Sequence, residues 1–470
     1  MSVHYDCLSK IAKEIRTKQV SPREVVRTHL QRADGLHASL NAFVYFDEVE
    51  ANGHAQTAEN AVMHGELLGP LHGVPVTVKS CIDVAGWPCA AGSLLRKDAR
   101  PSSDAPLVRR LRDAGAILLG STNTPEFLMA YETDNRVSGK TRNPWNTEYS
   151  AGGSSGGEAA AIASGCSVGG IGSDGGGSIR VPAHFCGICG LKPTPGRIPS
   201  TGHYPAGNSA FGWLGVAGPM ARTAKDLKIL FDVLRGPDAG DALSSPERIL
   251  EITSLVPKKT RIGILESNAL GVVTPETQFA VRKAAQLLSY EGFILEPFRV
   301  NNLERVLDLW WFFFGSVIGE LFAREFRGCE ELFSSIFRDY MEAAQVTTPE
   351  SPITMETFVS MCAARDQERE RILAAMADTP LLLSPVCLGP AFRHGEGHWK
   401  SGTGYRDTMR HSQWLNLAGF PGVSVPMGKS EAGLPIGVQI VGRPFEDELA
   451  LAAAERLEEA RGPWQRPEIS

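Results

Sequence analysis

The chain has 470 residues, of which 43% are hydrophobic and 21% are charged, with a formal net charge of −6. This composition is typical of a soluble globular protein and excludes disordered, collagen-like and coiled-coil chains. The mild acidity gives no electrostatic basis for binding nucleic acid or an anionic membrane. Nine cysteines, an odd number, and a polar start without an apolar signal segment predict a reducing, cytoplasmic location.

The first 120 residues predict alternating helices and strands. Ser21 and Pro22 are typical of a helix start, and the apolar run 74–79 predicts a strand. Asp104 and Pro106 are expected to open a helix that ends at Gly115, followed at once by a strand over 116–119. Strand, helix and strand in this order indicate a βαβ unit in a largely parallel sheet.

Residues 151–177 contain 11 glycines in 27 positions. Each glycine costs about 0.5–1 kcal/mol in a helix or strand interior, so only 158–164 is predicted to be regular, as a short helix. Apolar and polar residues such as Ile162, Asp174 and Arg180 lie among the glycines. A flexible linker does not need such residues. The pattern favours a backbone held close to a reacting group.

The remainder predicts helices over 223–234 and 275–292, a less regular segment over 240–400, strands over 422–426 and 436–441, and a helix over 447–461. The less regular segment contains the aromatic run Trp310–Phe314, which is either core or a pocket for an acyl group. Its longest uncharged stretch, Leu309–Gly319, has 11 residues. A membrane span needs about 20, so no transmembrane helix is predicted.

Two glycine motifs do not meet their structural requirements. The pattern Gly170-x-Gly172-x-x-Gly175 matches a dinucleotide fingerprint, but more glycines and Pro182 follow it, so no helix is expected to open there. No Gly-Lys-Ser/Thr closes a Walker loop. The pattern Gly152-Gly153-Ser154-Ser155-Gly156 matches a nucleophile elbow, but the polar residues before it do not suit a buried strand.

Two further patterns suggest metal ligands only weakly. His394 and His398 are four residues apart, but the two glycines between them argue against a helix, so a solvated loop is expected. Cys186 and Cys189 form one Cys-x-x-Cys without a second pair, which favours two small buried thiols.

One more combination of residues suits amide cleavage, which requires a nucleophile, a base and donors for the oxyanion. A lysine can act as the base where burial favours its neutral form, and Lys79 ends an apolar run. Ser154 and Ser155 could pass a proton between Lys79 and a nucleophile, because hydroxyls both donate and accept. The glycines before Ser178 would let backbone N–H groups converge on one point.

The glycine- and serine-rich stretches 152–157 and 172–180, with Cys186-Gly-Ile-Cys-Gly-Leu-Lys-Pro-Thr194, resemble the amidase signature family. The likeness covers at least 65–235 and resumes at 419–447, and it is closest to the branch similar to fatty acid amide hydrolase. In this resemblance Ser178 matches the acylated nucleophile, Lys79 the general base and Ser154 the bridging serine, whose preceding peptide bond is cis in the family. The backbone amides of Gly175, Gly176, Gly177 and Ser178 match the oxyanion hole, and the positions that orient the loop are Ser155, Ser173, Asp174 and Arg180.

The resemblance implies an α/β fold: one large domain over 1–470, with a mixed sheet of many strands and helices on both faces. Its parts would be a signature core (about 65–235), a variable substrate-side region (about 240–400) and closing strands and helix (about 415–465). The implied reaction is hydrolysis of a small-molecule amide, with an apolar acyl or aryl group favoured, through an acyl-enzyme. It requires no cofactor and no metal. The expected partners are the small-molecule amide and, as an assembly, a second copy of the chain in a homodimer.

Two positions depart from the family pattern. Gly175 stands where the family often has a branched residue or threonine. Met409 stands where the amidotransferase branch has an aspartate, seven residues before Asn416-Leu-Ala-Gly419. This departure weakens the alternative that the chain is the A subunit of a tRNA-dependent amidotransferase. A catalytically inactive binding protein is disfavoured because Lys79, Ser154 and Ser178 are all present.

Overall fold

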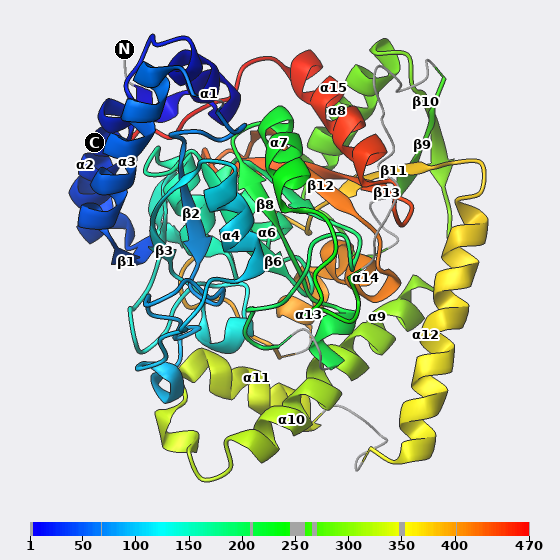
Figure 1. Ribbon diagram of the computed structural model, residues 1–470. Helices are drawn as coiled ribbons and strands as arrows, with labels where there is room; N and C mark the ends of the chain where they lie inside the picture. The colour runs from blue at the N-terminus through cyan, green and yellow to red at the C-terminus, as the bar shows by residue number, and fades with distance from the viewer. Residues whose placement is uncertain are drawn as a thin grey trace.

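A mixed sheet of 11 strands runs through the centre of the molecule (Figure 1). The computed structural model describes residues 3–66, 68–206, 210–244, 259–265, 270–346, 353–400 and 402–469. In spatial order the strands are β1 (Phe43–Phe46), β3 (Ile117–Thr122), β2 (Pro75–Lys79), β6 (Gly169–Asp174), β8 (Val216–Ala221), β7 (Cys189–Lys192), β12 (Gly422–Lys429), β13 (Pro435–Gly442), β11 (Leu381–Pro385), β9 (Arg261–Leu265) and β10 (Ile294–Phe298). A separate hairpin joins β4 (Arg142–Asn143) and β5 (Asn146–Ser150).

The sheet is parallel in two places and antiparallel elsewhere. β2 pairs in parallel with β3 and β6, and β9 pairs in parallel with β10 and β11. The other neighbouring pairs are antiparallel. The predicted βαβ unit is therefore confirmed, but a largely parallel sheet is wrong for the molecule as a whole.

Helices cover both faces of this sheet. α7, α8 and α15 pack together on one face, and α5 and α6 pack on the other, so that α15 and α6 both contact β12. The helices are α1 (Leu8–Arg16), α2 (Pro22–Leu40), α3 (Glu48–His64), α4 (Pro106–Asp113), α5 (Gly156–Ala163), α6 (Arg180–Cys186), α7 (Ala224–Leu234), α8 (Pro275–Tyr290), α9 (Leu303–Trp311), α10 (Ile318–Glu325), α11 (Ser335–Val346), α12 (Met355–Ala375), α13 (Tyr405–Thr408), α14 (Arg410–Ala418) and α15 (Asp447–Arg461).

Local sequence signals set several helix starts. The Ser21 and Thr223 side chains accept hydrogen bonds from the first-turn amides of α2 and α7, and Thr274 does the same for α8. Asp104 does not cap α4, which corrects the sequence expectation. Its carboxylate instead accepts bonds from the Ala85 amide and the Arg112 guanidinium.

The glycine-rich region contains more regular structure than its composition predicts. Gly169–Asp174 form β6, which is fully buried. A Cβ on Gly170 would lie 2.2 Å from the Glu158 carboxylate, and one on Gly172 would lie 2.8 Å from Ser155 Oγ. Close packing on both faces of this strand therefore requires glycine, which outweighs its low strand propensity. The prediction that no helix follows is also wrong, because α6 begins at Arg180 with Pro182 in its first turn.

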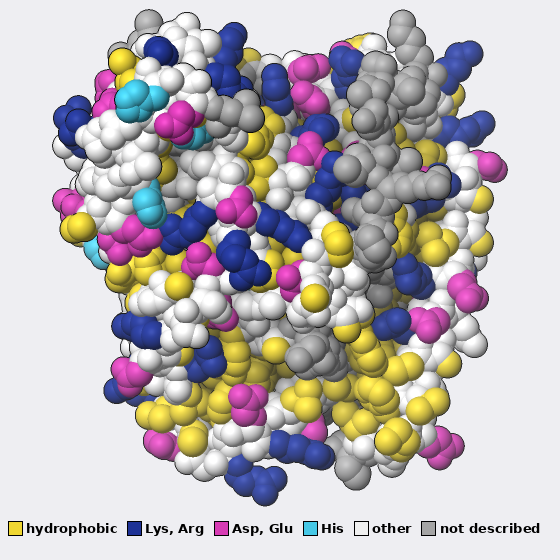
Figure 2. Space-filling view, viewed as in Figure 1, with side chains coloured by type: hydrophobic (Ala, Val, Ile, Leu, Met, Phe, Trp, Pro, Cys, Tyr) yellow, Lys and Arg dark blue, Asp and Glu magenta, His cyan; other side chains and the backbone are white. Residues whose placement is uncertain are grey.

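The segment 240–400 supplies β9, β10 and β11 to one end of the sheet and the helices α9 to α12 that lie beside it (Figure 1). Figure 2 shows hydrophobic side chains gathered on the lower half of the viewed face, over this helical layer. The exposed hydrophobic residues of these helices include Leu321, Met355 and Val359.

The helical run Leu303–Glu325 joins α9, a π-helical turn η5 (Phe312–Val317) and α10. It has 23 residues, and its most apolar 18-residue window has a mean hydropathy of 1.5, so length and composition alone would allow a membrane span. However, 72% of its most apolar window is buried inside the protein. This burial is typical of a core helix.

Candidate active site

Lys79 lies at the carboxyl end of β2, where its side chain is fully buried. Its Nζ is 2.6 Å from Ser154 Oγ and 3.1 Å from Ser173 Oγ. β2 and β6 are parallel neighbours, so their carboxyl ends meet at one edge of the sheet. This topology brings Lys79 and Ser173 together across 94 residues of sequence.

Burial lowers the pKa of Lys79 to about 8, although the charges of Cys81, Asp174 and Glu158 oppose the shift. The hydrogen bonds that Nζ makes to other described residues are those to the Ser154 and Ser173 hydroxyls. At neutral pH about a tenth of such amines are uncharged. A neutral amine in contact with a hydroxyl can accept its proton, which is the chemistry that the sequence predicts for Lys79.

Ser154 is buried between the hairpin β4–β5 and the start of α5. The peptide bond before it, Gly153–Ser154, is cis. The Thr124 hydroxyl donates a 2.8 Å hydrogen bond to the Ser154 carbonyl. This hydrogen bond holds the backbone that carries the hydroxyl facing Lys79.

Ser178 follows the glycine loop after β6 and is 9% exposed. The Ser155 backbone N–H donates to the Ser178 carbonyl at 3.1 Å. The backbone next to Ser154 is therefore in direct contact with the backbone of Ser178. The Ser178 hydroxyl makes no hydrogen bond to another of the described residues. The contact from Lys79 to Ser154 is thus formed, whereas a hydrogen bond from Ser154 to Ser178 is not.

The loop Gly175–Ser178 presents several backbone N–H groups. The Gly177 N–H is already engaged, because it donates to Asp174 Oδ1 at 2.7 Å. Among the described residues, the N–H groups of Gly175, Gly176 and Ser178 have no partner. The proposed oxyanion donors therefore narrow from four to these three.

Two aromatic side chains hold the loop from outside. The Trp310 indole N–H donates to the Gly175 carbonyl at 3.1 Å, and the Tyr131 hydroxyl donates to the Gly176 carbonyl at 2.6 Å. In a trans peptide the N–H points opposite to the carbonyl, so Trp310 directs the Gly176 N–H to the other side of the loop. Sequence reasoning gave no role to Tyr131, and no motif marks it.

Asp174 and Arg180 form a fully buried ion pair with a separation of 3.0 Å. Burial would raise the pKa of Asp174, but the guanidinium more than compensates and holds it well below its usual range. Besides Gly177, the Asp174 carboxylate accepts from the Ile179 N–H. Arg180 also donates to Gln439 and Asn416. This network ties the glycine loop to β13 and α14, and the sequence patterns gave no role to either amide.

Ser155 and Ser173 contact each other from opposite sides of the loop. The Ser155 hydroxyl donates to the Ser173 carbonyl at 3.2 Å and accepts from the Ser173 N–H at 3.3 Å. These two bonds join the Ser155 side chain to the backbone of Ser173 at the end of β6.

The aromatic run Trp310–Phe314 is buried throughout. A Cβ on Gly175 would lie 3.7 Å from both Phe314 and Phe211. The run is therefore part of the core, and its Phe314 side chain lies beside Gly175 of the glycine loop.

The weaker motifs do not assemble a metal site. His394 and His398 lie in irregular structure, and His394 Nδ1 is 2.6 Å from Glu132 Oε1. Within the described ranges no group of three or more His, Cys, Asp or Glu side chains is placed to hold a metal ion. Cys186 and Cys189 are buried free thiols, as predicted.

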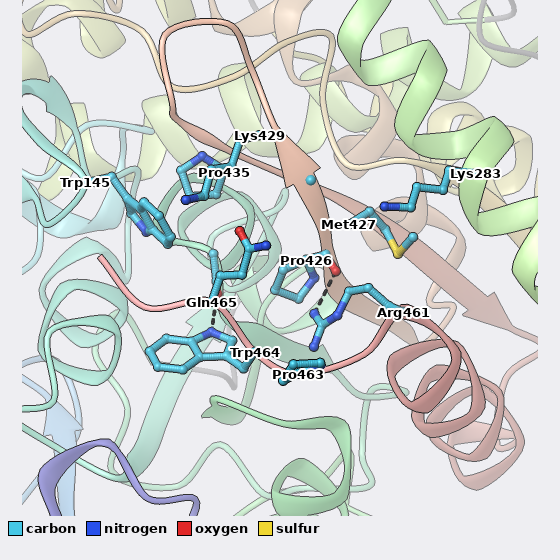
Figure 3. A pocket seen from close by; sticks show the side chains of 12 residues that line it. Trp145, Lys283, Pro426, Met427, Lys429, Pro435, Arg461, Pro463, Trp464 and Gln465 are labelled. Carbon is cyan, nitrogen blue, oxygen red and sulfur yellow. Dashed lines mark hydrogen bonds between the residues drawn. The ribbon is translucent and has the colours of Figure 1, made fainter. Parts of the chain in front are cut away.

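A groove of about 310 Å³ lies apart from these residues (Figure 3). Its lining includes Trp145, Lys429, Arg461 and Trp464. The Trp464 indole N–H donates to the Gly187 carbonyl, and Arg461 donates to the Pro426 carbonyl. None of Lys79, Ser154 and Ser178 lines this groove, so it is not the candidate active site.

Comparison with known proteins identifies relatives that match along almost the whole chain. An acylamidase of Rhodococcus erythropolis is 33% identical over 477 residues, which cover 98% of this chain and 97% of the relative. The A subunit of the glutamyl-tRNA(Gln) amidotransferase from Bdellovibrio bacteriovorus is 31% identical over 488 residues, with 98% of each chain covered. The structure of a bacterial aryl acylamidase superposes with a TM-score of 0.87 at 28% identity, covering 98% of this chain and 97% of that one.

A fatty acid amide hydrolase structure also matches, with a TM-score of 0.87 over 98% of this chain and 86% of that one, but its identity of 24% shows a shared fold alone. The family model for amidases matches residues 24–451. The chain therefore belongs to the amidase family, the amidase signature enzymes, which cleave the carbon–nitrogen bond of amides.

Proposed function

We propose that the protein hydrolyses a carboxylic amide through an acyl-enzyme on Ser178. The observation that carries this proposal is the 2.6 Å contact between buried Lys79 and Ser154. In the first step Lys79 accepts the proton of Ser154, Ser154 accepts that of Ser178, and Ser178 Oγ bonds to the amide carbon. The N–H groups of Gly175, Gly176 and Ser178 stabilise the resulting oxyanion.

The carbon–nitrogen bond then breaks as the proton returns along the same path to the nitrogen, so that a neutral amine leaves. Water attacks the acyl ester by the same route and releases the acid and the Ser178 hydroxyl. The missing hydrogen bond between Ser154 and Ser178 is compatible with this path, since catalytic hydrogen bonds often tighten only when substrate binds.

We also propose that the acyl group is apolar or aryl. Phe314 and Phe211 lie beside Gly175 of the glycine loop, and aromatic side chains favour apolar ligands. The names of the acylamidase and aryl acylamidase relatives support this choice. All nine cysteines are free thiols, which supports a reducing, cytoplasmic location.

The competing proposal is the A subunit of a tRNA-dependent amidotransferase, which the Bdellovibrio relative favours. The buried Met409 offers no carboxylate at the position where that branch has its aspartate. Glutamine hydrolysis together with co-purification of a second subunit would establish this function instead.

The test of the proposed function is labelling of the purified protein by a fluorophosphonate, followed by assays on short and long acyl amides, anilides and glutamine. We expect labelling of the wild type and of Ser360→Ala, an exposed serine on α12. Ser178→Ala should lose both labelling and turnover. Labelling that persists in Ser178→Ala would show that the nucleophile is another residue.

A further inference from the structure

A second chain of buried contacts leads from Lys79 to a cysteine and a histidine. Ser173 Oγ lies 3.1 Å from Lys79 Nζ and 3.9 Å from Cys81 Sγ. Cys81 Sγ in turn lies 3.5 Å from His203 Nε2. Cys81 is fully buried and His203 is 9% exposed, so bulk water does not screen these groups.

The hydrogen bonds of His203 fix its tautomer. His203 Nδ1 is 2.9 Å from the Pro205 carbonyl oxygen. A carbonyl can only accept, so Nδ1 carries the hydrogen and the Nε2 lone pair faces the thiol. The proton of the Cys81 thiol can therefore move to Nε2, which leaves a thiolate beside an imidazolium.

The local charges favour this transfer. Burial alone would raise the pKa of Cys81, but the charges of His203 and Lys79, with hydrogen bonds from His203 and Ser173, bring it below its usual value. Burial and the charge of Lys79 lower the pKa of His203, but Cys81 and the Pro205 carbonyl raise it by more. The other titratable groups that act on this pair are Asp83 and Cys89.

Lys79 needs such a partner at one stage of the reaction. When it accepts a proton from Ser154, a buried ammonium forms, and an unpaired buried charge is costly. The nearest carboxylates are otherwise engaged: Asp174 pairs with Arg180, and Glu158 hydrogen-bonds to Thr77 and Thr122. Burial raises the pKa of Glu158 to about 7, so its charge is also incomplete at neutral pH.

We propose that Cys81 and His203 form a thiolate–imidazolium pair whose sulfur, acting through the Ser173 hydroxyl, stabilises the ammonium form of Lys79. The proposal rests on the proposed role of Lys79 as the base. Cys81 and His203 are positioning residues, since they act on Lys79 and not on the substrate. Removing the thiolate should lower the pKa of Lys79 and make it a weaker base.

The test measures the rate of fluorophosphonate labelling against pH for the wild type, Cys81→Ser, Cys81→Ala, His203→Gln and the double variant Cys81→Ser/His203→Gln. A nearby opposite charge shifts a pKa by about one unit or more. We therefore expect the acid limb to move about one unit to lower pH in each variant, and the limiting rate to fall about threefold. The double variant should shift no further than Cys81→Ser. Cys166→Ser, a buried thiol outside this chain of contacts, should behave as the wild type.

An unchanged acid limb in Cys81→Ser, an additive shift in the double variant or an equal shift in Cys166→Ser would overturn the proposal. Thiolate absorbance in the ultraviolet gives a readout that needs no turnover. The wild type should show it at neutral pH, and Cys81→Ser and His203→Gln should both lose it. A wild-type absorbance titration without a thiolate at neutral pH would overturn the pair even if the variants fail to fold. Failure of the wild type to label would instead refute the proposed function.

Discussion

The indole of Trp310 donates a 3.1 Å hydrogen bond to the carbonyl of Gly175, a residue 135 positions earlier in the chain. This bond fixes one peptide of the loop that carries the proposed oxyanion donors. A loop that is already fixed before substrate binds does not have to reorganise when the transition state forms. This preorganisation of the donors is the main source of oxyanion stabilisation.

Trp310→Phe should therefore lower kcat more than it raises KM. The phenyl ring preserves most of the packing but cannot donate the bond, whose loss costs about 1 kcal/mol, or about fivefold in rate. Trp464→Phe is a matched control, because the Trp464 indole makes the same kind of bond to the Gly187 carbonyl away from the site. Equal effects of the two variants on kcat would refute a specific role for Trp310.

Two adjacent glycines should respond differently to a methyl group. A Cβ on Gly176 would lie 2.5 Å from the Trp310 ring and 2.7 Å from the Tyr131 hydroxyl, whereas one on Gly175 meets nothing closer than 3.7 Å. We expect Gly176→Ala to displace the loop and reduce kcat/KM by at least tenfold, since losing one oxyanion donor costs about 10²-fold or more. Gly175→Ala should retain activity within about threefold. Comparable losses in both would contradict the packing described here.

The pH dependence of kcat/KM should follow the protonation of Lys79. The base is active only when neutral, so the rate should rise about tenfold per pH unit at low pH and level off above about 8. Lys79→Met should reduce kcat by about 10²-fold or more, while its unfolding temperature stays close to that of the wild type. The exposed Lys225→Met serves as the control. A near-normal rate in Lys79→Met would remove Lys79 from the mechanism.

The buried pair of Asp174 and Arg180 should contribute strongly to stability. Asp174→Asn leaves the Arg180 charge without its counterion, and breaking a buried pair costs about 3–5 kcal/mol. Asp232→Asn breaks the ion pairs of Asp232 with Lys228 and Arg235 at the surface and should cost less than about 1 kcal/mol. Chemical denaturation of both variants measures these differences. A loss below about 1 kcal/mol in Asp174→Asn would show that the network is dispensable for folding.

The sequence by itself determined the family and the helix starts at Ser21, Thr223 and Thr274, and it predicted the residues of the proposed site. These features depend on local chemistry: a hydroxyl caps the helix that follows it, and the motif residues occupy short, continuous stretches. The prediction for the glycine-rich region was wrong because its structure depends on contacts with residues distant in the sequence. Whether Gly169–Asp174 form a strand depends on Thr77, Glu158 and Ser155 packing against it, and propensity does not include such contacts.

Only the tertiary structure decided which distant groups meet. Parallel pairing of β2 with β6 places Lys79 beside Ser173, and the packing of α9 brings Trp310 to the glycine loop. The meeting of Cys81 with His203 across 122 residues has no local signal, because neither side chain belongs to a motif. Long-range contacts of this kind arise from how the elements pack, and that packing also sets the burial that lowers the pKa of Lys79.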